Sequence, residues 1–366
     1  YVMKIGLITI HYANSYGGVL QAFSTQIILS KFGDVAIVDY RSKHLDNSMK
    51  TIRLSRNPRS LLWMVKDVAR FFPRYRLIKK FKSFVLKYYN LTDKYGDIDE
   101  MFGLDDQFDV FVTGSDQIWN PNIVGGLDSV YMLGFVNKKR KISFASSAGS
   151  YCFSRKEEAV VRGRLEVFSS LSVRESNTAN YLTKLLEGKP VSHVLDPTLM
   201  LSRQEWLGAL DIPEYNGDKF ILVYTLKKSR LVREVVKNIS KRLGLRVVSI
   251  DQDPFLGYPV DEHIMDASPR DYVKLISQAS MVITNSFHGT AFSVNFAVPF
   301  ISITPETGLN RIADFLSSVG LSERLIKNTK DIEDVLSLPL SFESVHQRLN
   351  ELRRCSFDFL DQAFKE

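Results

Sequence analysis

Apolar runs and amphipathic runs alternate along this chain of 366 residues. Unbroken apolar runs, as at 4–10 (KIGLITI), 35–40 (VAIVDY) and 219–226 (KFILVYTL), are typical of strands that are buried on both faces. The segments that follow them, such as 17–33 and 230–243, carry apolar residues at helical spacing. Buried strands that alternate with amphipathic helices predict an α/β fold, in which helices cover both faces of a parallel sheet.

The pattern of strands and helices starts again after the polar stretch 213–218 (PEYNGD). A polar stretch with Pro and Gly is typical of a domain junction, and the length of the chain suits two domains better than one. We therefore expect two Rossmann-like parallel-sheet domains, an N-terminal α/β domain over 1–212 and a C-terminal α/β domain over 213–341. A C-terminal helical segment is expected over 342–366.

Positive charge is concentrated in the segment 51–90, which holds eleven Lys and Arg residues and one acid, Asp67. The whole chain has a net charge of +7, so the remainder is slightly acidic. We expect this segment to be a basic helical insertion in the N-terminal domain. Its cations are interleaved with apolar residues such as Leu61, Trp63, Phe81 and Phe84, which is typical of a helix at an anionic membrane surface and also of a solvated helix. Both interpretations stay open, whereas no nucleic-acid motif accompanies the charge and no nucleic-acid partner is expected.

Cysteine and histidine patterns give no sign of a disulfide framework or a metal site. The two cysteines, Cys152 and Cys355, do not form a CxxC motif, and the six histidines show no HxH or HxxxH spacing. The first apolar run is too short for a signal peptide or a membrane span, and Met3 is interpreted as the natural start. We therefore expect a cytoplasmic protein without a metal, which would reach the inner face of the cell membrane only through its basic segment.

Polar residues directly after strands are informative because ligands bind outside the carboxyl ends of the strands in open parallel sheets. Five such turns occur, at 11–18 (HYANSYGG), 113–121 (TGSDQIWNP), 146–150 (SSAGS), 173–176 (VRES) and 285–290 (NSFHGT). The first two turns offer Asn14, Tyr16, Ser115 and Asp116 as candidate ligand contacts. Small polar residues also cap helices and form turns, so a structural role stays open for each of them.

The fifth turn joins a predicted strand directly to a predicted helix, and it contains a histidine. The first N–H groups of a helix have no partner within the helix, so Ser286, Gly289 and Thr290 mark a natural site for an anion. His288 lies on the same turn, and histidine can hold or donate a proton near neutral pH. A packing or capping role for His288 is the alternative.

Seven segments, taken in order, resemble the polysaccharide pyruvyl transferase family. They are NSYGGVLQAFSTQ (14–26), FDVFVTGSDQIWNP (108–121), ISFASSAG (142–149), LSVRES (171–176), VLDPTLML (194–201), MVITNSFHGTAFSVNFAVPFISI (281–303) and NRIADFLSSVGLSER (310–324). The resemblance implies a GT-B-like fold with two α/β domains facing a cleft, the N-terminal domain on the acceptor side and the C-terminal domain on the donor side. It also implies transfer of a pyruvyl group from phosphoenolpyruvate to a sugar or a lipid-linked glycan, as in exopolysaccharide synthesis, with formation of a ketal and without a cofactor.

This chemistry needs protein groups that bind the phosphate and the carboxylate of the donor, and one group that donates a proton. By the resemblance, the turn at Ser286, Gly289 and Thr290 would bind the phosphate, and His288 would be the general acid. Arg174 and Arg311 lie in the segments most like the arginine-bearing segments of the family, and an arginine can hold a carboxylate with two hydrogen bonds. An ion pair between Arg174 and Glu175 and a solvated position for Arg311 are the structural alternatives.

One departure from the family concerns the fifth turn. Relatives carry an Arg-Leu-His triplet where this chain has Ser286-Phe287-His288. Lys227, Lys228 or Arg311 would have to replace the missing cation. Two other functions therefore stay open: a GT-B-type glycosyltransferase that uses a nucleotide-sugar donor, for which Glu306 is the candidate ribose ligand, and a non-catalytic glycan-binding relative.

Overall fold

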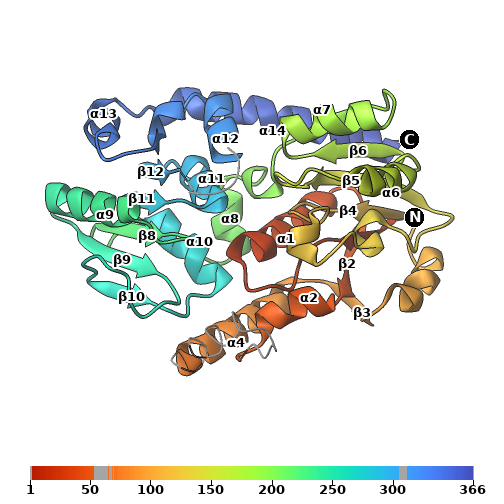
Figure 1. Cartoon of the computed structure of the whole chain (residues 1–366), viewed down its shortest axis with the longest axis horizontal. Coiled ribbons are helices and arrows are strands. Elements are labelled where there is room, and N and C mark those ends of the chain that lie inside the picture. Colours follow the sequence, from red (N-terminus) through yellow and green to blue (C-terminus); the bar gives the residue numbers. More distant parts are fainter. Residues whose placement is uncertain (1, 53–64, 66–67, 69, 305–310, 366) are drawn as a thin grey trace. The chain divides into compact units, whose positions relative to one another are not determined.

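The computed structural model describes residues 2–52, 65, 68, 70–304 and 311–365, and Figure 1 shows their ribbon. The chain divides into two compact units. The first unit comprises 1–50, 85–200 and 351–366, and the second comprises 51–84 and 201–350. Each unit contains one parallel sheet, so the expected pair of parallel-sheet α/β domains is confirmed. The domain boundaries that we drew from the sequence stay predictions.

The sheet of the first unit has seven strands among the described residues, in the order β3-β2-β1-β4-β5-β6-β7. All neighbouring strands pair in parallel. The strands are β1 (Lys4–Ile8), β2 (Asp34–Tyr40), β3 (Leu91–Tyr95), β4 (Val110–Thr113), β5 (Arg140–Ser146), β6 (Ser170–Val173) and β7 (Val191–His193). Strands β2 and β3 follow β1 toward one edge of the sheet, and β5, β6 and β7 follow β4 toward the other edge. The strand order therefore reverses between β1 and β4. The carboxyl ends of these two strands are therefore where a doubly wound sheet binds its ligand.

Helices and 3-10 turns connect these strands. The α-helices of the first unit are α1 (Tyr16–Leu29), α2 (Lys43–Asp46), α5 (Pro121–Val124), α6 (Arg155–Leu165) and α7 (Ser176–Leu185). The 3-10 turns are η1 (Asn47–Met49), η2 (Ile98–Asp106), η3 (Ser129–Met132) and η4 (Pro197–Leu199). Side chains such as Phe111, Trp119, Tyr131 and Phe135 fill the core of this unit and are almost fully buried. Burial on both faces explains why the strands have unbroken apolar sequences.

The second unit repeats this arrangement with six strands among the described residues, in the order β10-β9-β8-β11-β12-β13. They are β8 (Phe220–Tyr224), β9 (Arg246–Ile250), β10 (Glu262–Ile264), β11 (Met281–Thr284), β12 (Phe300–Ile303) and β13 (Leu325–Ile326). The helices are α8 (Arg203–Ala209), α9 (Arg230–Leu243), α10 (Pro269–Gln278), α11 (Phe287–Asn295), α12 (Arg311–Val319) and α13 (Asp331–Ser337), with the 3-10 turn η5 (Ser322–Arg324). Here the strand order reverses between β8 and β11. The turn from β11 to α11, which contains His288, is therefore at the ligand-binding position of this sheet.

Two long helices belong to both units. Helix α14 (Phe342–Lys365) is one continuous helix, and its last turns pack on the first unit, where Phe364 stacks on Phe32 with ring centroids 4.6 Å apart. Helix α4 (Phe71–Tyr88) lies within the basic insertion and makes up most of its described part. Among the described residues, no helix is both long enough and apolar enough to span a bilayer.

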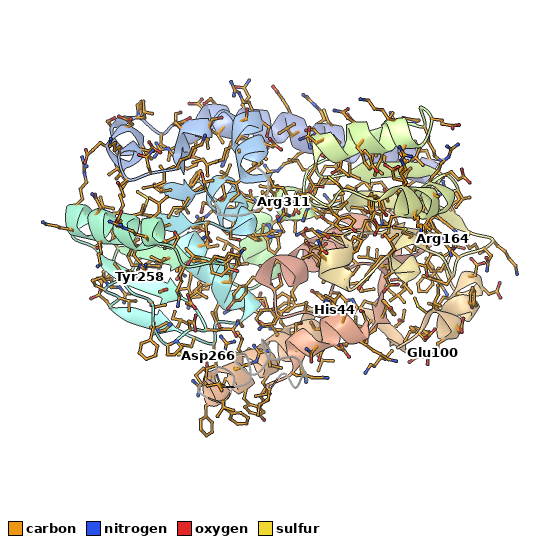
Figure 2. All side chains as sticks on the ribbon, in the orientation of Figure 1. His44, Glu100, Arg164, Tyr258, Asp266 and Arg311 are labelled. Carbon is orange, nitrogen blue, oxygen red and sulfur yellow. The ribbon has the colours of Figure 1, made fainter. Side chains whose placement is uncertain are left out.

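Helix α4 buries one face and exposes the other. Leu77, Ile78, Phe81 and Phe84 are buried, so the apolar residues of the insertion at these positions belong to the core. Arg76 and Lys80 bind the carboxylate of Asp266, which is labelled in Figure 2, at 2.6 and 3.3 Å. The exposed face carries Phe72, Tyr75, Lys79, Lys82 and Leu86. Leu61, Leu62 and Trp63 lie outside the described residues.

The start of β2 illustrates how closely the backbone of the first unit is packed. Gly33 lies just before β2, and a Cβ atom at this position would be 2.2 Å from the carbonyl oxygen of Met3. Gly163 provides the opposite case, because it lies within α6 and a Cβ atom there would meet nothing within 4 Å.

We expect Gly33→Ala to lower the free energy of unfolding by about 1–3 kcal/mol, because the backbone must shift to relieve the clash. Gly163→Ala should raise it by about 0.5–1 kcal/mol, because alanine loses less conformational entropy than glycine in a helix. Urea denaturation of the two variants and the parent protein measures both changes. Equal stability of the two variants would contradict the close approach of Gly33 to Met3.

Candidate active site

The strand-order reversal of the first unit brings together the loop after β1 and the turn after β4. The Thr9 hydroxyl donates a hydrogen bond to the carbonyl oxygen of Ser115 at 2.8 Å. A Cβ atom on Gly18, in the first turn of α1, would lie 3.2 Å from Oδ2 of Asp116. The predicted turns at 11–18 and 113–121 therefore lie next to each other, as the parallel pairing of β1 with β4 requires.

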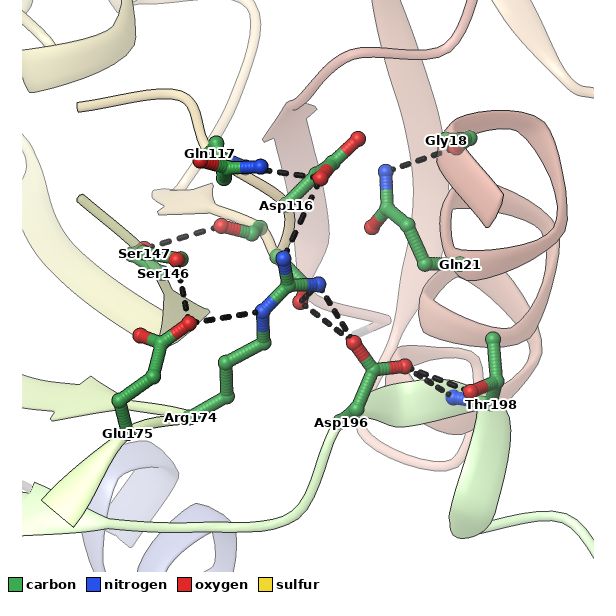
Figure 3. A network of polar contacts seen from close by, with 12 residues as sticks. Gly18, Gln21, Asp116, Gln117, Ser146, Ser147, Arg174, Glu175, Asp196 and Thr198 are labelled. Atoms are coloured by element: carbon green, nitrogen blue, oxygen red, sulfur yellow. Dashed lines mark hydrogen bonds and ion pairs between the residues drawn. The ribbon is translucent and has the colours of Figure 1, made fainter. Parts of the chain in front are cut away.

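Arg174, which directly follows β6, is at the centre of a buried ionic network (Figure 3). Its side chain is 2% exposed. The guanidinium donates from Nη1 to Asp196 at 2.6 Å, from Nη2 to Asp116 at 3.3 Å and from Nε to Glu175 at 3.2 Å. The structural alternative considered for Arg174, an ion pair with Glu175, is thus present. Its contact with a substrate carboxylate stays a prediction.

Three carboxylates around one guanidinium leave an excess of negative charge. Burial acts to lower the pKa of Arg174, but Asp196, Glu175 and Asp116 raise it further above its ordinary value, so the guanidinium remains charged. The second carboxylate oxygen of Glu175, Oε2, is buried and accepts no hydrogen bond in the described part of the chain. An excess of carboxylates favours a ligand that donates hydrogen bonds, such as a hydroxyl, over an anion.

Asp116 is the most exposed of the three carboxylates in this network. Its side chain is 15% exposed, compared with 1% for Asp196. Its φ of 72° places a non-glycine residue in the left-handed region, which costs on the order of 1–3 kcal/mol and is often found at functional sites. Oδ1 accepts hydrogen bonds from Arg174 and from the N–H group of Gln117, and no hydrogen bond from the described residues reaches Oδ2. Asp116 is therefore held by two donors while one oxygen stays available for a ligand.

The other candidates of the first unit have identifiable structural contacts. Ser115 is fully buried. Tyr16 is buried as the first residue of α1, where the preceding Ser15 caps the helix by accepting from the N–H group of Gly18. Asn14 is half-buried, and its N–H group donates to the hydroxyl of Ser48 at 3.2 Å. Contacts of these residues with a ligand stay predictions.

In the second unit, the turn from β11 to α11 forms the helix N-terminus that the sequence predicts. Ser286 is the N-cap, and its hydroxyl accepts from the N–H group of Gly289 at 3.4 Å. The Thr290 hydroxyl donates to the Ser286 carbonyl oxygen at 3.0 Å and contacts the Ser302 hydroxyl at 2.7 Å. Gly289 has no room for a side chain, because a Cβ atom would lie 2.4 Å from Oγ1 of Thr284. The two hydroxyls thus shape the turn, and their contact with a phosphate stays a prediction.

His288 occupies the second position of α11, where it is half-buried. Its Nε2 atom is shielded from solvent. The imidazole packs edge-on against the ring of Phe287 with centroids 5.2 Å apart. The histidine is therefore held by an aromatic contact at the positive end of the helix dipole, a position suited to an anionic ligand.

Arg311 supplies a cation close to this turn. Its guanidinium carbon lies 5.7 Å from the centroid of the Phe287 ring, on its face; Figure 2 labels Arg311. Lys228 is engaged elsewhere, because its ammonium group binds Asp251 and Asp253 at 3.6 and 3.3 Å. Of the three cations considered as replacements for the missing family arginine, Arg311 is thus placed next to the residue that precedes His288. Glu306 lies outside the described residues.

Sequence reasoning did not identify several polar residues that the fold places at these edges. Asp196 binds Arg174, and Asn285 links two turns of the second unit by accepting from the N–H group of Leu226 and donating to the carbonyl of Lys227. In the first unit, His11 contacts Asp39, which also binds Arg41. Each of these residues ends a buried strand or follows one closely. The sequence shows this position, but it does not show which turns become neighbours in the fold.

The comparisons with known proteins agree with this architecture. No curated protein matches the chain. Among solved structures, the UDP-GlcNAc 2-epimerase of Neisseria meningitidis bound to UDP-GlcNAc has a TM-score of 0.59 at 11% identity, covering 98% of this chain and 100% of that chain. The UDP-N-acetylglucosamine 2-epimerase of Rickettsia bellii has a TM-score of 0.51 at 10% identity, covering 100% and 98%. Identities this low show the fold alone, and the expected GT-B-like class of two α/β domains is confirmed.

The comparison with protein-family models identifies the family. The matched residues lie in both units and include the Arg174 network and the turn with His288. The family model "Polysaccharide pyruvyl transferase" matches residues 16–307. The resemblance that the ordered segments indicated is therefore confirmed, and this chain belongs to the polysaccharide pyruvyl transferase family.

Proposed function

We propose that this protein transfers the pyruvyl group of phosphoenolpyruvate to a sugar of a polysaccharide or glycan precursor and forms a cyclic ketal. The observation that carries the proposal is the placement of His288 on a helix N-terminus at the strand-order reversal of the second unit, with Arg311 against Phe287. A helix N-terminus and a guanidinium suit the phosphate and the carboxylate of this donor, and the histidine suits its need for a proton.

In the first step, the donor becomes electrophilic by taking a proton. The imidazolium of His288 gives its proton to C3 of phosphoenolpyruvate, whose double-bond electron pair forms the new C–H bond. The charge that develops at C2 is stabilised by the oxygen of the bridging phosphate group. Arg311 would hold the substrate carboxylate during this step, in place of the arginine that relatives carry in their triplet.

In the second step, a sugar hydroxyl attacks C2. The imidazole of His288, which lost its proton in the first step, takes the hydroxyl proton as the C–O bond forms. Phosphate then leaves with the electron pair of its C–O bond. A second hydroxyl of the same sugar adds to C2 and closes the ketal, and its proton passes to the released phosphate. The first unit, with its excess of carboxylates, would thus serve the acceptor, and the second unit would serve the anionic donor.

We also propose that the basic insertion contacts an anionic membrane. The exposed face of α4 combines Phe72 and Tyr75, which are 72% and 52% exposed, with Lys79 and Lys82. Aromatic rings next to cations are typical of helices that lie in the interface of a bilayer. Such a contact would bring the enzyme to an acceptor glycan built on a lipid carrier.

His288→Gln should lower turnover at least about 100-fold, because the variant keeps the shape of the turn but cannot protonate the donor. Phosphate release from phosphoenolpyruvate in the presence of candidate sugar acceptors measures the effect. His193→Gln, at the exposed end of β7, is the matched control and should retain parent activity. Turnover of His288→Gln within a few-fold of the parent would remove this residue from the mechanism.

Arg311 and Arg174 should respond differently to substitution by methionine. Arg311→Met should reduce the rise in melting temperature that phosphoenolpyruvate causes, because binding to the native state stabilises it and this variant loses a donor contact. Arg174→Met should lower the stability of the ligand-free protein by about 3–5 kcal/mol, because it leaves buried carboxylates without their cation. Arg230→Met, at an exposed position on α9, is the control for both effects.

Thermal shifts with other ligands separate the alternatives. If nucleoside diphosphate sugars stabilise the parent protein and phosphoenolpyruvate does not, a glycosyltransferase function replaces the proposal. If sugars bind but no phosphate is released with any acceptor, the chain is a non-catalytic glycan-binding relative.

Vesicle co-sedimentation should show binding to anionic vesicles and not to neutral ones, and the binding should decrease as salt increases. Phe72→Ser combined with Tyr75→Ser, and Lys79→Glu combined with Lys82→Glu, should each reduce it. Lys237→Glu with Lys241→Glu on α9 makes the same charge change on another exposed helix face and is the control. Equal binding by the α4 variants and the control would show that α4 is an ordinary solvated helix.

A further inference from the structure

Asn285 directly follows β11 and joins the turn from β11 to α11 to the loop after β8. The strand order reverses between these two strands, and Tyr224 at the end of β8 pairs with Thr284 at the end of β11. Asn285 is 7% exposed. Its Oδ1 accepts from the N–H group of Leu226 at 2.7 Å, and its Nδ2 donates to the carbonyl oxygen of Lys227 at 2.8 Å. One buried amide therefore connects two turns at the ligand-binding position of this sheet.

The loop after β8 is not anchored by apolar burial. Leu226, its apolar residue, is 66% exposed. The hydroxyl of Thr225, at the start of the loop, is buried but makes no hydrogen bond in the described part of the chain. The amide of Asn285 offers both a donor and an acceptor, so it serves two backbone groups of the loop at once. Its removal would take a partner from each of them and loosen the loop.

The turn from β11 to α11 needs cations from outside its own sequence. Residues 285–290 contain no lysine or arginine. The donor of the proposed function carries both a phosphate and a carboxylate, whereas Arg311 supplies one guanidinium. Lys228 is engaged by two carboxylates of the neighbouring loop. Lys227 is exposed and lies in the loop that Asn285 holds, which places it next to the N-terminus of α11.

We propose that Asn285 is a positioning residue of the donor site and that Lys227 is the cation that it positions for the donor phosphate. The proposal rests on the proposed function, because it names further groups of the same site. A lysine ammonium is a common partner of phosphate. A cation whose backbone is fixed before the ligand arrives loses less conformational entropy on binding, so Asn285 raises the affinity for the donor without touching it.

The test measures anion binding separately from transfer. The intact protein is titrated by calorimetry with phosphoenolpyruvate and, separately, with inorganic phosphate, without an acceptor. Asn285→Ala and Lys227→Met should each raise the Kd of both ligands about tenfold or more. Asn285→Ala combined with Lys227→Met should bind no more weakly than Lys227→Met alone, because Asn285 acts through this cation. Asn285→Gln keeps the amide and should bind more tightly than Asn285→Ala.

Two control variants separate positioning from stability and from net charge. Asn295, the last residue of α11, is 2% exposed, and its Nδ2 donates to the carbonyl oxygen of Leu201 at 2.8 Å. Asn295→Ala loses the same kind of contact at the other end of the same helix, so it should lower the melting temperature, as Asn285→Ala does, but leave Kd unchanged. Lys237→Met removes one positive charge from an exposed position on α9 and should also leave Kd unchanged.

The outcomes separate this proposal from the proposed function. If Asn285→Ala binds both ligands as the parent does, or if Asn295→Ala weakens binding equally, Asn285 is a structural residue and the proposal falls, even where phosphate release is retained. Additive losses in the double variant would also overturn it, because Asn285 would then act independently of Lys227. If inorganic phosphate binds with the expected dependence on both residues but phosphoenolpyruvate does not bind, the positioning role stands and pyruvyl transfer falls. If neither ligand binds the parent protein, both proposals fall. In an active enzyme, the two variants should raise KM for phosphoenolpyruvate and leave KM for the acceptor unchanged.

Discussion

Parallel strand pairing is the constraint on which both units depend. A parallel strand can return to its sheet only through a crossover, so all carboxyl ends lie at one edge and all the turns that follow them meet there. In each unit the strand order also reverses once, between β1 and β4 and between β8 and β11. The turn with Asp116 and the turn with His288 are both at such a reversal, where neighbouring crossovers leave the sheet in opposite directions and a ligand finds room.

The two units differ in the charge that they present at this position. In the first unit, Arg174 is enclosed by Asp116, Glu175 and Asp196, and the excess of carboxylates favours groups that donate hydrogen bonds. In the second unit, a helix N-terminus and Arg311 favour an anion. Removing one partner of a buried network leaves a charge without compensation, which is far more costly than the network's net contribution to stability. Arg174 can therefore stay charged although it is almost completely buried, because the three carboxylates compensate its charge, and its hydrogen bond fixes the position of Asp116.

Buried charges in the first unit act mainly by orienting their neighbours. Arg174 and Gln117 hold one oxygen of Asp116, and His11 with Arg41 holds Asp39. In both places, the groups that remain available are hydrogen-bond acceptors or hydroxyls. A sheet edge with fixed acceptors suits an acceptor sugar, because a sugar is recognised through its hydroxyls and needs little charge.

The sequence by itself determined the fold class, the family and the turn that carries His288, because these depend on local patterns: apolar runs, turn residues after strands and seven ordered segments. It also predicted Ser286 as part of a helix N-terminus, which requires only neighbouring residues. It could not determine that Arg174 is surrounded by Asp196 and Asp116, or that Arg311 lies against Phe287. These partners are far apart in the chain or on different turns, and only the strand order decides which turns become neighbours. Tertiary packing likewise decided which residues of α4 are buried, because a helical pattern shows that a face is apolar but not what covers it.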